Sequence, residues 1–342
     1  MPGADRTAAP AGLRGSDFYA AIRRNERNTL LLCATMLLIG SGLGYVLGWA
    51  AEFLGAAGPD RDALLSPWDL FIAPSTWGLV GAGGMAAASA LWVIIALLFG
   101  DRILLAMAGA RETTPEEETQ LHNVVEEMAI AAGLPKPRVF VIETPALNAF
   151  AAGLKPEKSA VAVTRGLLDK LQRHELQGVV AHEMGHIANN DVLYATAIGV
   201  VVGLIALVTD MLWRSFRYGR FGRSSGRRRG GKGGGAVALV LLVVFVVAIL
   251  APLAAKLVQM AISREREYLA DATAVKLTRS PLGLIGALQK IDGSSERFEG
   301  ANRAIQHLFI ANPLRKFTER STALFSTHPP MEQRIARLRD LG

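Results

Sequence analysis

His182-Glu183-Met184-Gly185-His186 is the stretch from which the fold of this chain is best inferred. The residues around it predict a helix over 174–190, and side chains four positions apart lie on one face of a helix. His182 and His186 can then direct both imidazoles at one metal ion, with Glu183 beside them. This geometry is typical of zinc peptidases. The alternative is a helix that has two polar residues on one face.

The composition predicts membrane segments. Of the 342 residues 51% are hydrophobic and the mean hydropathy is +0.28, which is high for a soluble protein. Apolar runs span residues 29–51, 77–99, 192–213 and 236–262. The first two are each long enough to cross a bilayer core of roughly 30 Å and should form an antiparallel hairpin. Glycines that would let the two helices approach closely are Gly40, Gly42, Gly44, Gly48, Gly81, Gly83 and Gly84.

The net charge of +7 is local and does not indicate a nucleic-acid-binding protein. A Gly/Ser-rich linker at residues 214–235 holds the cations Arg214, Arg217, Arg220, Arg223, Arg227, Arg228, Arg229 and Lys232. No recognition fold or aromatic stacking platform accompanies it, so we expect a solvated connector or a contact with lipid headgroups. The single cysteine, Cys33, lies in an apolar run and provides no thiolate zinc site.

The expected fold class is α+β: a mainly helical zincin-type metallopeptidase domain with a small sheet, joined to four hydrophobic helices. Short buried strands are predicted at residues 138–142, 148–153 and 159–164. A helix that precedes them should begin at the N-cap Thr114 and end at Gly133. The chain is expected to divide into a cytoplasmic tail (1–28), a transmembrane hairpin (29–99), a first half of the domain that carries HEMGH (100–191), a second hydrophobic hairpin (192–262) and a second half of that domain (263–342).

A third metal ligand is needed, because a catalytic zinc site combines three protein ligands with an open position. Glu267 and Asp271 lie four residues apart on one face of a predicted helix. One carboxylate could bind the metal while the other orients a ligand imidazole. An ordinary salt-bridged helix face is an equal alternative on spacing alone.

The motifs together resemble the HtpX family of membrane zinc endopeptidases and, more distantly, the CAAX prenyl endopeptidases. They are HEMGH, SREREYLAD at residues 263–271, and Thr327-His328-Pro329-Pro330 with Arg334. The resemblance covers roughly residues 113–341. It implies that His182, His186 and Glu267 bind one zinc ion, that Glu183 is the general base, and that Asp271 is the second acid of an ExxxD motif.

The resemblance also implies a substrate site. Asn148-Ala149-Phe150-Ala151 matches a stretch that the family places on an edge strand beside the cleft. An extended peptide could pair with such an edge through its main chain. His328 matches a histidine on the oxyanion side, and Arg334 an arginine that supports it. Without the resemblance, His328 would be read as an ordinary residue before the last helix, and the strand could instead lie inside the sheet.

The predicted protein is a membrane-bound zinc endopeptidase of a bacterial inner membrane, with its catalytic domain in the cytoplasm. Its partners would be polypeptides, namely membrane or misfolded proteins, and the lipid bilayer, with no nucleic acid. Quality control and stress response are implied by the resemblance. The orientation follows from the basic flank Arg23, Arg24 and Arg27, by the positive-inside rule.

Three alternatives stay open. A processing peptidase of the CAAX prenyl endopeptidase type would cleave one tagged peptide. A non-catalytic membrane scaffold would bind zinc through four protein ligands. An ion carrier would place ionisable residues deep in several membrane runs, and the first three runs have almost none.

Overall fold

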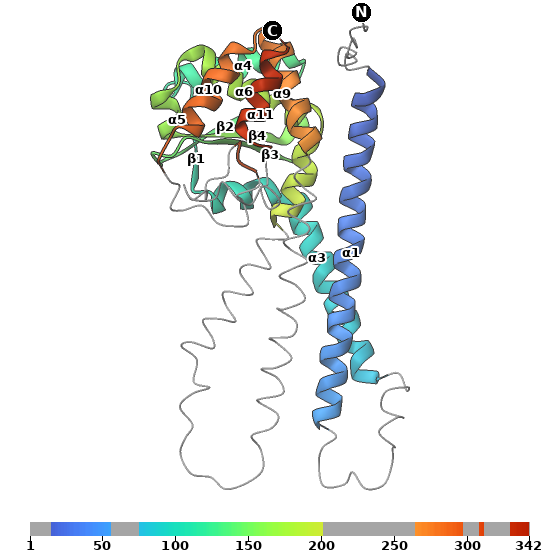
Figure 1. The fold of residues 1–342 in the computed structure, drawn as a ribbon. Coiled ribbons are helices and arrows are strands. Elements are labelled where there is room, and N and C mark those ends of the chain that lie inside the picture. The colour runs from blue at the N-terminus through green and yellow to red at the C-terminus, as the bar shows by residue number, and fades with distance from the viewer. Residues whose placement is uncertain (1–14, 56–74, 201–263, 297–307, 311–328, 342) are drawn as a thin grey trace, which may run out of the picture.

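The computed structural model describes residues 15–55, 75–200, 264–296, 308–310 and 329–341. In these ranges the chain forms a long helical hairpin and a mixed domain above it (Figure 1). The domain is mainly helical and contains a small mixed sheet, which confirms that part of the expected fold class. Of the four predicted hydrophobic helices, two lie in the described residues. The third run begins as the apolar helix Asp191–Val200, and its remainder, the fourth run and the basic linker lie outside the described residues.

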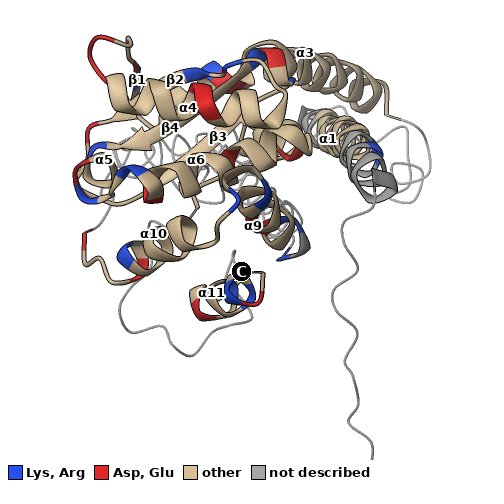
Figure 2. Cartoon of the chain, turned by 90° about the horizontal axis from the view of Figure 1, so that it is seen from above, with Lys and Arg blue, Asp and Glu red and all other residues tan. Residues whose placement is uncertain are grey.

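The hairpin consists of α1 (Gly15–Gly55) and α3 (Thr76–Met107), which are both longer than the apolar runs that predicted them. Arg27–Val46 and Thr76–Met107 are long and apolar enough to cross a membrane. Only 17% and 6% of their apolar windows are buried, so neither resembles the core helix of a soluble domain. Figure 2 shows the charged residues gathered on the mixed domain, while most of α3 carries none.

Small residues bring α1 and α3 into close contact. A Cβ atom on Gly44 would lie 2.1 Å from the carbonyl oxygen of Gly81, and one on Gly48 would lie 1.9 Å from that of Trp77. Only glycine fits at such an approach of two backbones. The prediction was too broad, however, because a Cβ on Gly42, Gly83 or Gly84 would meet nothing within 4 Å.

The sheet has the strand order β1-β2-β4-β3. Its strands are β1 (Ala110–Glu112), β2 (Arg138–Ile142), β3 (Ala149–Gly153) and β4 (Ser159–Thr164). β2 and β4 are parallel, whereas β3 pairs antiparallel with β4 through the short 3-10 turn at Pro156–Lys158. The three predicted strands are confirmed. β3 lies at an end of this strand order and thus has one edge that no strand covers among the described residues.

Alternate residues of the strands enter two separate hydrophobic cores, as expected for a sheet that is covered on both faces. Val139, Val161 and Ala151 belong to the first core, which contains the helices of the mixed domain. Phe140, Ala162 and Phe150 belong to the second, which also holds Leu104 and Leu105 from the end of α3. The mixed domain therefore packs directly against the end of α3 (Figure 1).

The helices of the mixed domain are α4 (Thr119–Ala132), α5 (Arg165–Lys170), α6 (Arg173–Ala188), α9 (Arg264–Thr278), α10 (Leu282–Asp292) and α11 (Met331–Arg339). The predicted start of α4 was wrong. The carbonyl of Thr114 accepts hydrogen bonds from the N–H groups of Glu117 and Glu118 in a turn, and the helix begins only at Thr119. Its predicted end is confirmed, since Gly133 adopts the left-handed conformation with φ 66°.

α6 carries the HEMGH motif through the middle of the domain. Glycines allow its neighbours to approach it: a Cβ on Gly178 would lie 2.4 Å from the backbone nitrogen of Leu284 in α10. A Cβ on Gly185 would lie 3.2 Å from the Cα atom of Ala270 in α9. α9 is therefore a second helix that lies directly against the HEMGH motif.

Candidate metal centre

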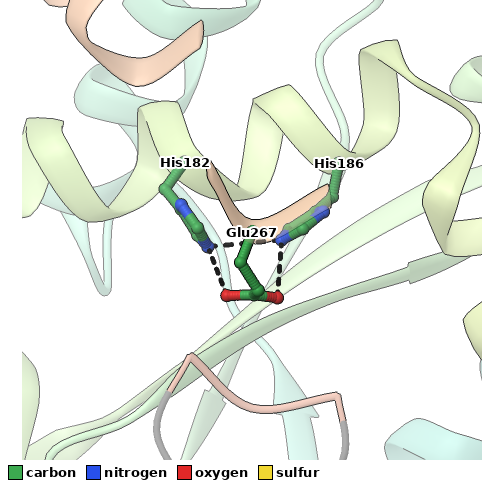
Figure 3. Close-up of side chains that lie close together, drawn as sticks. All are labelled: His182, His186 and Glu267. Atoms are coloured by element: carbon green, nitrogen blue, oxygen red, sulfur yellow. Dashed lines mark hydrogen bonds and ion pairs between the residues drawn. The ribbon is translucent and has the colours of Figure 1, made fainter. Parts of the chain in front are cut away.

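His182, His186 and Glu267 converge on one point (Figure 3). The two imidazoles project from one face of α6, and their Nε2 atoms are 3.2 Å apart. Glu267 enters from α9, with one carboxylate oxygen 3.8 Å from Nε2 of His182 and the other 3.7 Å from Nε2 of His186. The structure thus brings together the three residues that the sequence proposed as ligands.

The dimensions and the donor set of this cluster fit zinc. Two imidazole nitrogens at about 2.0–2.1 Å from a tetrahedral zinc ion would be about 3.3 Å apart, close to the 3.2 Å between the two Nε2 atoms. Two nitrogens and one carboxylate oxygen form a donor set that zinc accepts. Among the described residues the cluster offers three ligands, as expected for a catalytic site with one open position.

Asp271 contacts His182 at the ring nitrogen that faces away from Glu267, and Arg334 in turn binds Asp271. The Nδ1 atom of His182 lies 2.9 Å from Oδ1 of Asp271, so the opposite ring nitrogen faces Glu267 and His186. Arg334 donates two hydrogen bonds to this carboxylate, at 2.9 and 2.6 Å, and a third to the carbonyl of Ile310 at 3.2 Å. The positions predicted for Asp271 and Arg334 therefore adjoin the metal cluster.

The pKa shifts of Asp271 and His182 follow from these contacts. Burial alone would raise the pKa of Asp271, but Arg334 and His182 overcompensate and lower this pKa to about 2. Burial also lowers the pKa of the His182 imidazole, as does the nearby Arg334. At neutral pH Asp271 is ionised and His182 is neutral, which is the protonation state that a metal ligand requires.

Asp191 is a contact that the sequence reasoning missed. Its Oδ2 atom lies 3.1 Å from Nδ1 of His186, and its side chain is 7% exposed. Burial lowers the pKa of His186, but Asp191 and Glu267 outweigh it and raise this pKa to about 9 in the metal-free protein. No spacing rule indicates the pair, because residues five apart do not share a helix face. The one hint is that Asp191 directly follows the helix predicted over 174–190.

Glu183 lies beside the ligands but is not one of them. It is 2% exposed, and this burial raises its pKa to about 7, although the nearby His186 opposes the shift. The backbone N–H of Ala151, in β3, donates a hydrogen bond to the Glu183 carboxylate. The general base predicted from the motif is thus in contact with the predicted substrate strand.

β3 offers main-chain atoms and almost no side chains. Ala149, Phe150, Ala151 and Ala152 are all buried, and the Phe150 ring packs edge-on against Phe309 with centroids 5.1 Å apart. Asn148, which precedes the strand, is 2% exposed, and its side-chain oxygen accepts the N–H of Ala149. Side-chain recognition by this stretch is therefore excluded in this conformation.

The outer edge of β3 is partly occupied. The carbonyl of Asn148 accepts the N–H of Thr164 in β4, so Ala149, Ala151 and Gly153 direct their main-chain groups away from β4. The N–H of Ile310 donates to the carbonyl of Ala149 at 2.9 Å. At the other end the N–H of Gly153 donates to Oγ1 of Thr196 at 3.1 Å. Ala151 lies between these two contacts.

His328, the predicted oxyanion-side residue, lies outside the described residues. Its assignment stays a prediction. The described chain resumes at Pro329, immediately before the helix that carries Arg334.

Comparison with known sequences agrees with this geometry. The family model described as "Peptidase family M48" matches residues 115–341. A protein of Thermoanaerobacter pseudethanolicus named "Protease HtpX homolog" is 41% identical over 323 residues, which are 94% of this chain and 97% of that protein. One of the same name from Listeria innocua is 46% identical over 259 residues, covering 75% and 85%. These matches confirm the resemblance inferred from the motifs.

Among solved structures, the crystal structure of S. mikatae Ste24p matches with a TM-score of 0.44 and 21% identity. The match covers 75% of this chain and 57% of that one.

Proposed function

The chain belongs to peptidase family M48, and from this premise we propose that it is a membrane-bound zinc endopeptidase of protein quality control. It would hydrolyse peptide bonds of membrane or misfolded proteins at the cytoplasmic face. Its activity as a metalloendopeptidase follows from the family.

The convergence of His182, His186 and Glu267 carries the proposal. Three potential ligand atoms from two helices lie within 4.8 Å of one another, and the two ring nitrogens on the far sides contact carboxylates. A buried cluster of this kind is expected to bind zinc. A scaffold protein would close its zinc site with a fourth protein ligand, and the three-residue cluster among the described residues favours the catalytic alternative.

The chain's own residues account for the proton transfers. A zinc ion held by His182, His186 and Glu267 would supply a Lewis acid that polarises the scissile carbonyl and activates water. Glu183 accepts the proton from the attacking water and passes it to the leaving nitrogen. Its pKa of about 7 suits a group that must accept and release a proton near neutral pH. His328, by resemblance, donates a hydrogen bond to the developing oxyanion.

The substrate is assigned to the outer edge of β3, over Asn148, Ala149, Phe150 and Ala151. A peptide would pair as an additional strand with the main chain around Ala151, next to Glu183. Because the side chains of Ala149, Phe150 and Ala151 are buried, the strand would read the peptide backbone and accept many sequences. This breadth supports unfolded polypeptides as substrates.

The membrane location is supported by α1 and α3. Both pass the length and hydropathy requirements of a membrane span, and the C-terminal end of α3 enters the core beneath the sheet. The active site would therefore lie a short distance above the bilayer. Basic residues at the start of α1, with Arg23, Arg24 and Arg27, favour the cytoplasm for this side.

The test compares Glu183→Gln with wild type in the purified full-length chain. We expect Glu183→Gln to bind zinc in the wild-type amount and to cleave casein about 10²–10⁴-fold more slowly, because only the base is lost. Glu332→Gln, on the exposed face of α11, is the matched control and should behave as wild type. Wild-type cleavage by Glu183→Gln, or a wild-type chain that binds no zinc, would refute the proposal.

The product pattern separates quality control from specific processing. Mass spectrometry of casein digests should show many cleavage sites of varied sequence, since the strand offers a backbone edge. A single site, or cleavage restricted to a tagged peptide, would favour the processing alternative.

A further inference from the structure

The turn after α6 redirects the chain toward His186. α6 ends at Ala188, and Asn190 then adopts the left-handed conformation with φ 54°. Asparagine tolerates this conformation better than most residues. In an uninterrupted helix, positions 186 and 191 would be about 140° apart around the axis and could not meet. The left-handed residue instead places Asp191 at the start of the helix Asp191–Val200, with Oδ2 3.1 Å from Nδ1 of His186.

Arg266 holds the same carboxylate from α9. Its Nε atom lies 3.9 Å from Oδ1 of Asp191, and its guanidinium packs over the Tyr194 ring at 4.9 Å from the centroid. Arg266 immediately precedes the ligand Glu267 in the chain. The cluster of Asp191, Tyr194 and Arg266 thus joins α9 to the helix Asp191–Val200, which follows α6 in the chain.

The two histidines have partners of the same kind. Behind His182 stands Asp271, which is held by Arg334; behind His186 stands Asp191, which is held by Arg266. In both cases a carboxylate contacts Nδ1 and leaves Nε2 to face the metal position. Carboxylates in this place fix the tautomer and the orientation of a ligand imidazole and strengthen metal binding.

We propose that Asp191 is a positioning residue of the metal centre, which holds His186 with Nε2 toward the metal. The inference rests on the proposed zinc site and adds a residue to it. A competing role would be purely local, because a carboxylate at the first residue of a helix also stabilises the helix terminus. Serine is also compatible with a helix terminus, but it is uncharged and too short to reach His186.

The experiment measures the zinc dissociation constant of the full-length chain in detergent by competition with a chromophoric chelator. Asp191→Ser is expected to weaken zinc binding about 10–100-fold, and Asp191→Asn by a smaller factor because an amide oxygen can still accept from Nδ1. Asp340→Asn, at the exposed end of α11, is the control and should leave the constant unchanged.

Two further measurements separate positioning from stability. The melting temperature of the metal-free chain should fall in Asp191→Ser, because the contacts with His186 and Arg266 are lost. The rise on adding zinc should in addition be smaller for the variant than for wild type. The visible spectrum of the Co²⁺-loaded chain should change in Asp191→Ser and Asp191→Asn and stay constant in Asp340→Asn, since it reports ligand geometry.

The outcomes are distinguishable. Zinc affinity within twofold of wild type in both Asp191 variants, with an unchanged cobalt spectrum, would overturn the inference. A lower metal-free melting temperature with unchanged zinc affinity would also overturn it and assign Asp191 to the helix terminus alone. A wild-type chain that binds no zinc would instead refute the proposed function.

Discussion

Arg334 and Asp271 form a fully buried ion pair, in which the guanidinium donates two hydrogen bonds to the carboxylate at 2.9 and 2.6 Å. Arg334 has 0% exposed surface, and another of its nitrogens lies 3.5 Å from Glu267. A cation on α11 therefore contacts both Asp271 and the candidate metal ligand Glu267. The pair connects the last helix of the chain to His182.

Replacement of this arginine should be strongly destabilising. Arg334→Leu leaves Asp271 buried without its cation, and the loss of one partner of a buried ion pair costs about 3–5 kcal/mol. The free energy of unfolding of the metal-free, full-length chain would measure the effect. Arg339→Leu is a matched control on the exposed face of the same helix and should change this free energy by less than about 0.5 kcal/mol. Equal effects of the two variants would contradict the burial of Arg334.

Glu183 should make the metal-free protein less stable as the pH rises. Burial raises its pKa from 4.5 to about 7 on folding, so the folded state holds the proton more tightly than the unfolded state does. The contribution of Glu183 to the free energy of unfolding is then most favourable below about pH 4.5 and is lost as the pH rises through about 7. Glu183→Gln removes this loss, and the variant should gain up to about 3 kcal/mol relative to wild type between pH 5 and pH 8.

Chemical denaturation of both metal-free proteins at the two pH values measures this difference. His186 and Asp271 are present in both, which makes the pair a matched comparison. A stability difference that does not change with pH would contradict the raised pKa of Glu183.

The contact between α1 and α3 should depend on single glycines. A methyl group on Gly44 would overlap the carbonyl oxygen of Gly81, so Gly44→Ala should separate the helices and lower the melting temperature in detergent. Gly42 faces open space two residues away, and Gly42→Ala should be neutral or slightly stabilising because alanine favours helix. The difference in melting temperature between the two variants measures how much the contact between α1 and α3 stabilises the protein. A melting temperature that Gly44→Ala leaves at the wild-type value would rule out the observed packing.

The orientation in the membrane can be tested with one cysteine. Ile130 on α4 is 73% exposed, and Cys33 is the single cysteine of the chain. In a Cys33→Ser background, Ile130→Cys should react with a membrane-impermeant maleimide in inside-out vesicles and not in intact cells. Labelling in intact cells would place the catalytic domain outside the cytoplasm. Detergent-solubilised protein, which should label fully, is the control for reactivity.

Local patterns predicted the elements of the domain well. The strands Arg138–Ile142 and Ser159–Thr164 and the helix that carries HEMGH lie close to where periodicity placed them. Each of these elements depends on the spacing of hydrophobic residues over a short stretch, which can be read directly from the sequence. The predicted start of α4 was wrong because Thr114 closes a turn instead of capping the helix. Turns and helix caps use the same residue types, so the sequence does not separate them.

The sequence by itself determined the candidate metal-binding pair, because His182 and His186 share a helix face through backbone geometry alone. Spacing also placed Glu267 and Asp271 on one helix face, and the resemblance gave them their roles. Tertiary structure decided the rest: that α9 approaches α6 closely enough for Glu267 to reach both imidazoles, and that Phe150 lies buried, so the edge strand offers only its main chain. The contact of Asp191 with His186 also belongs to the tertiary structure. It depends on one left-handed residue and on the packing of a distant helix, and neither is a property of local spacing.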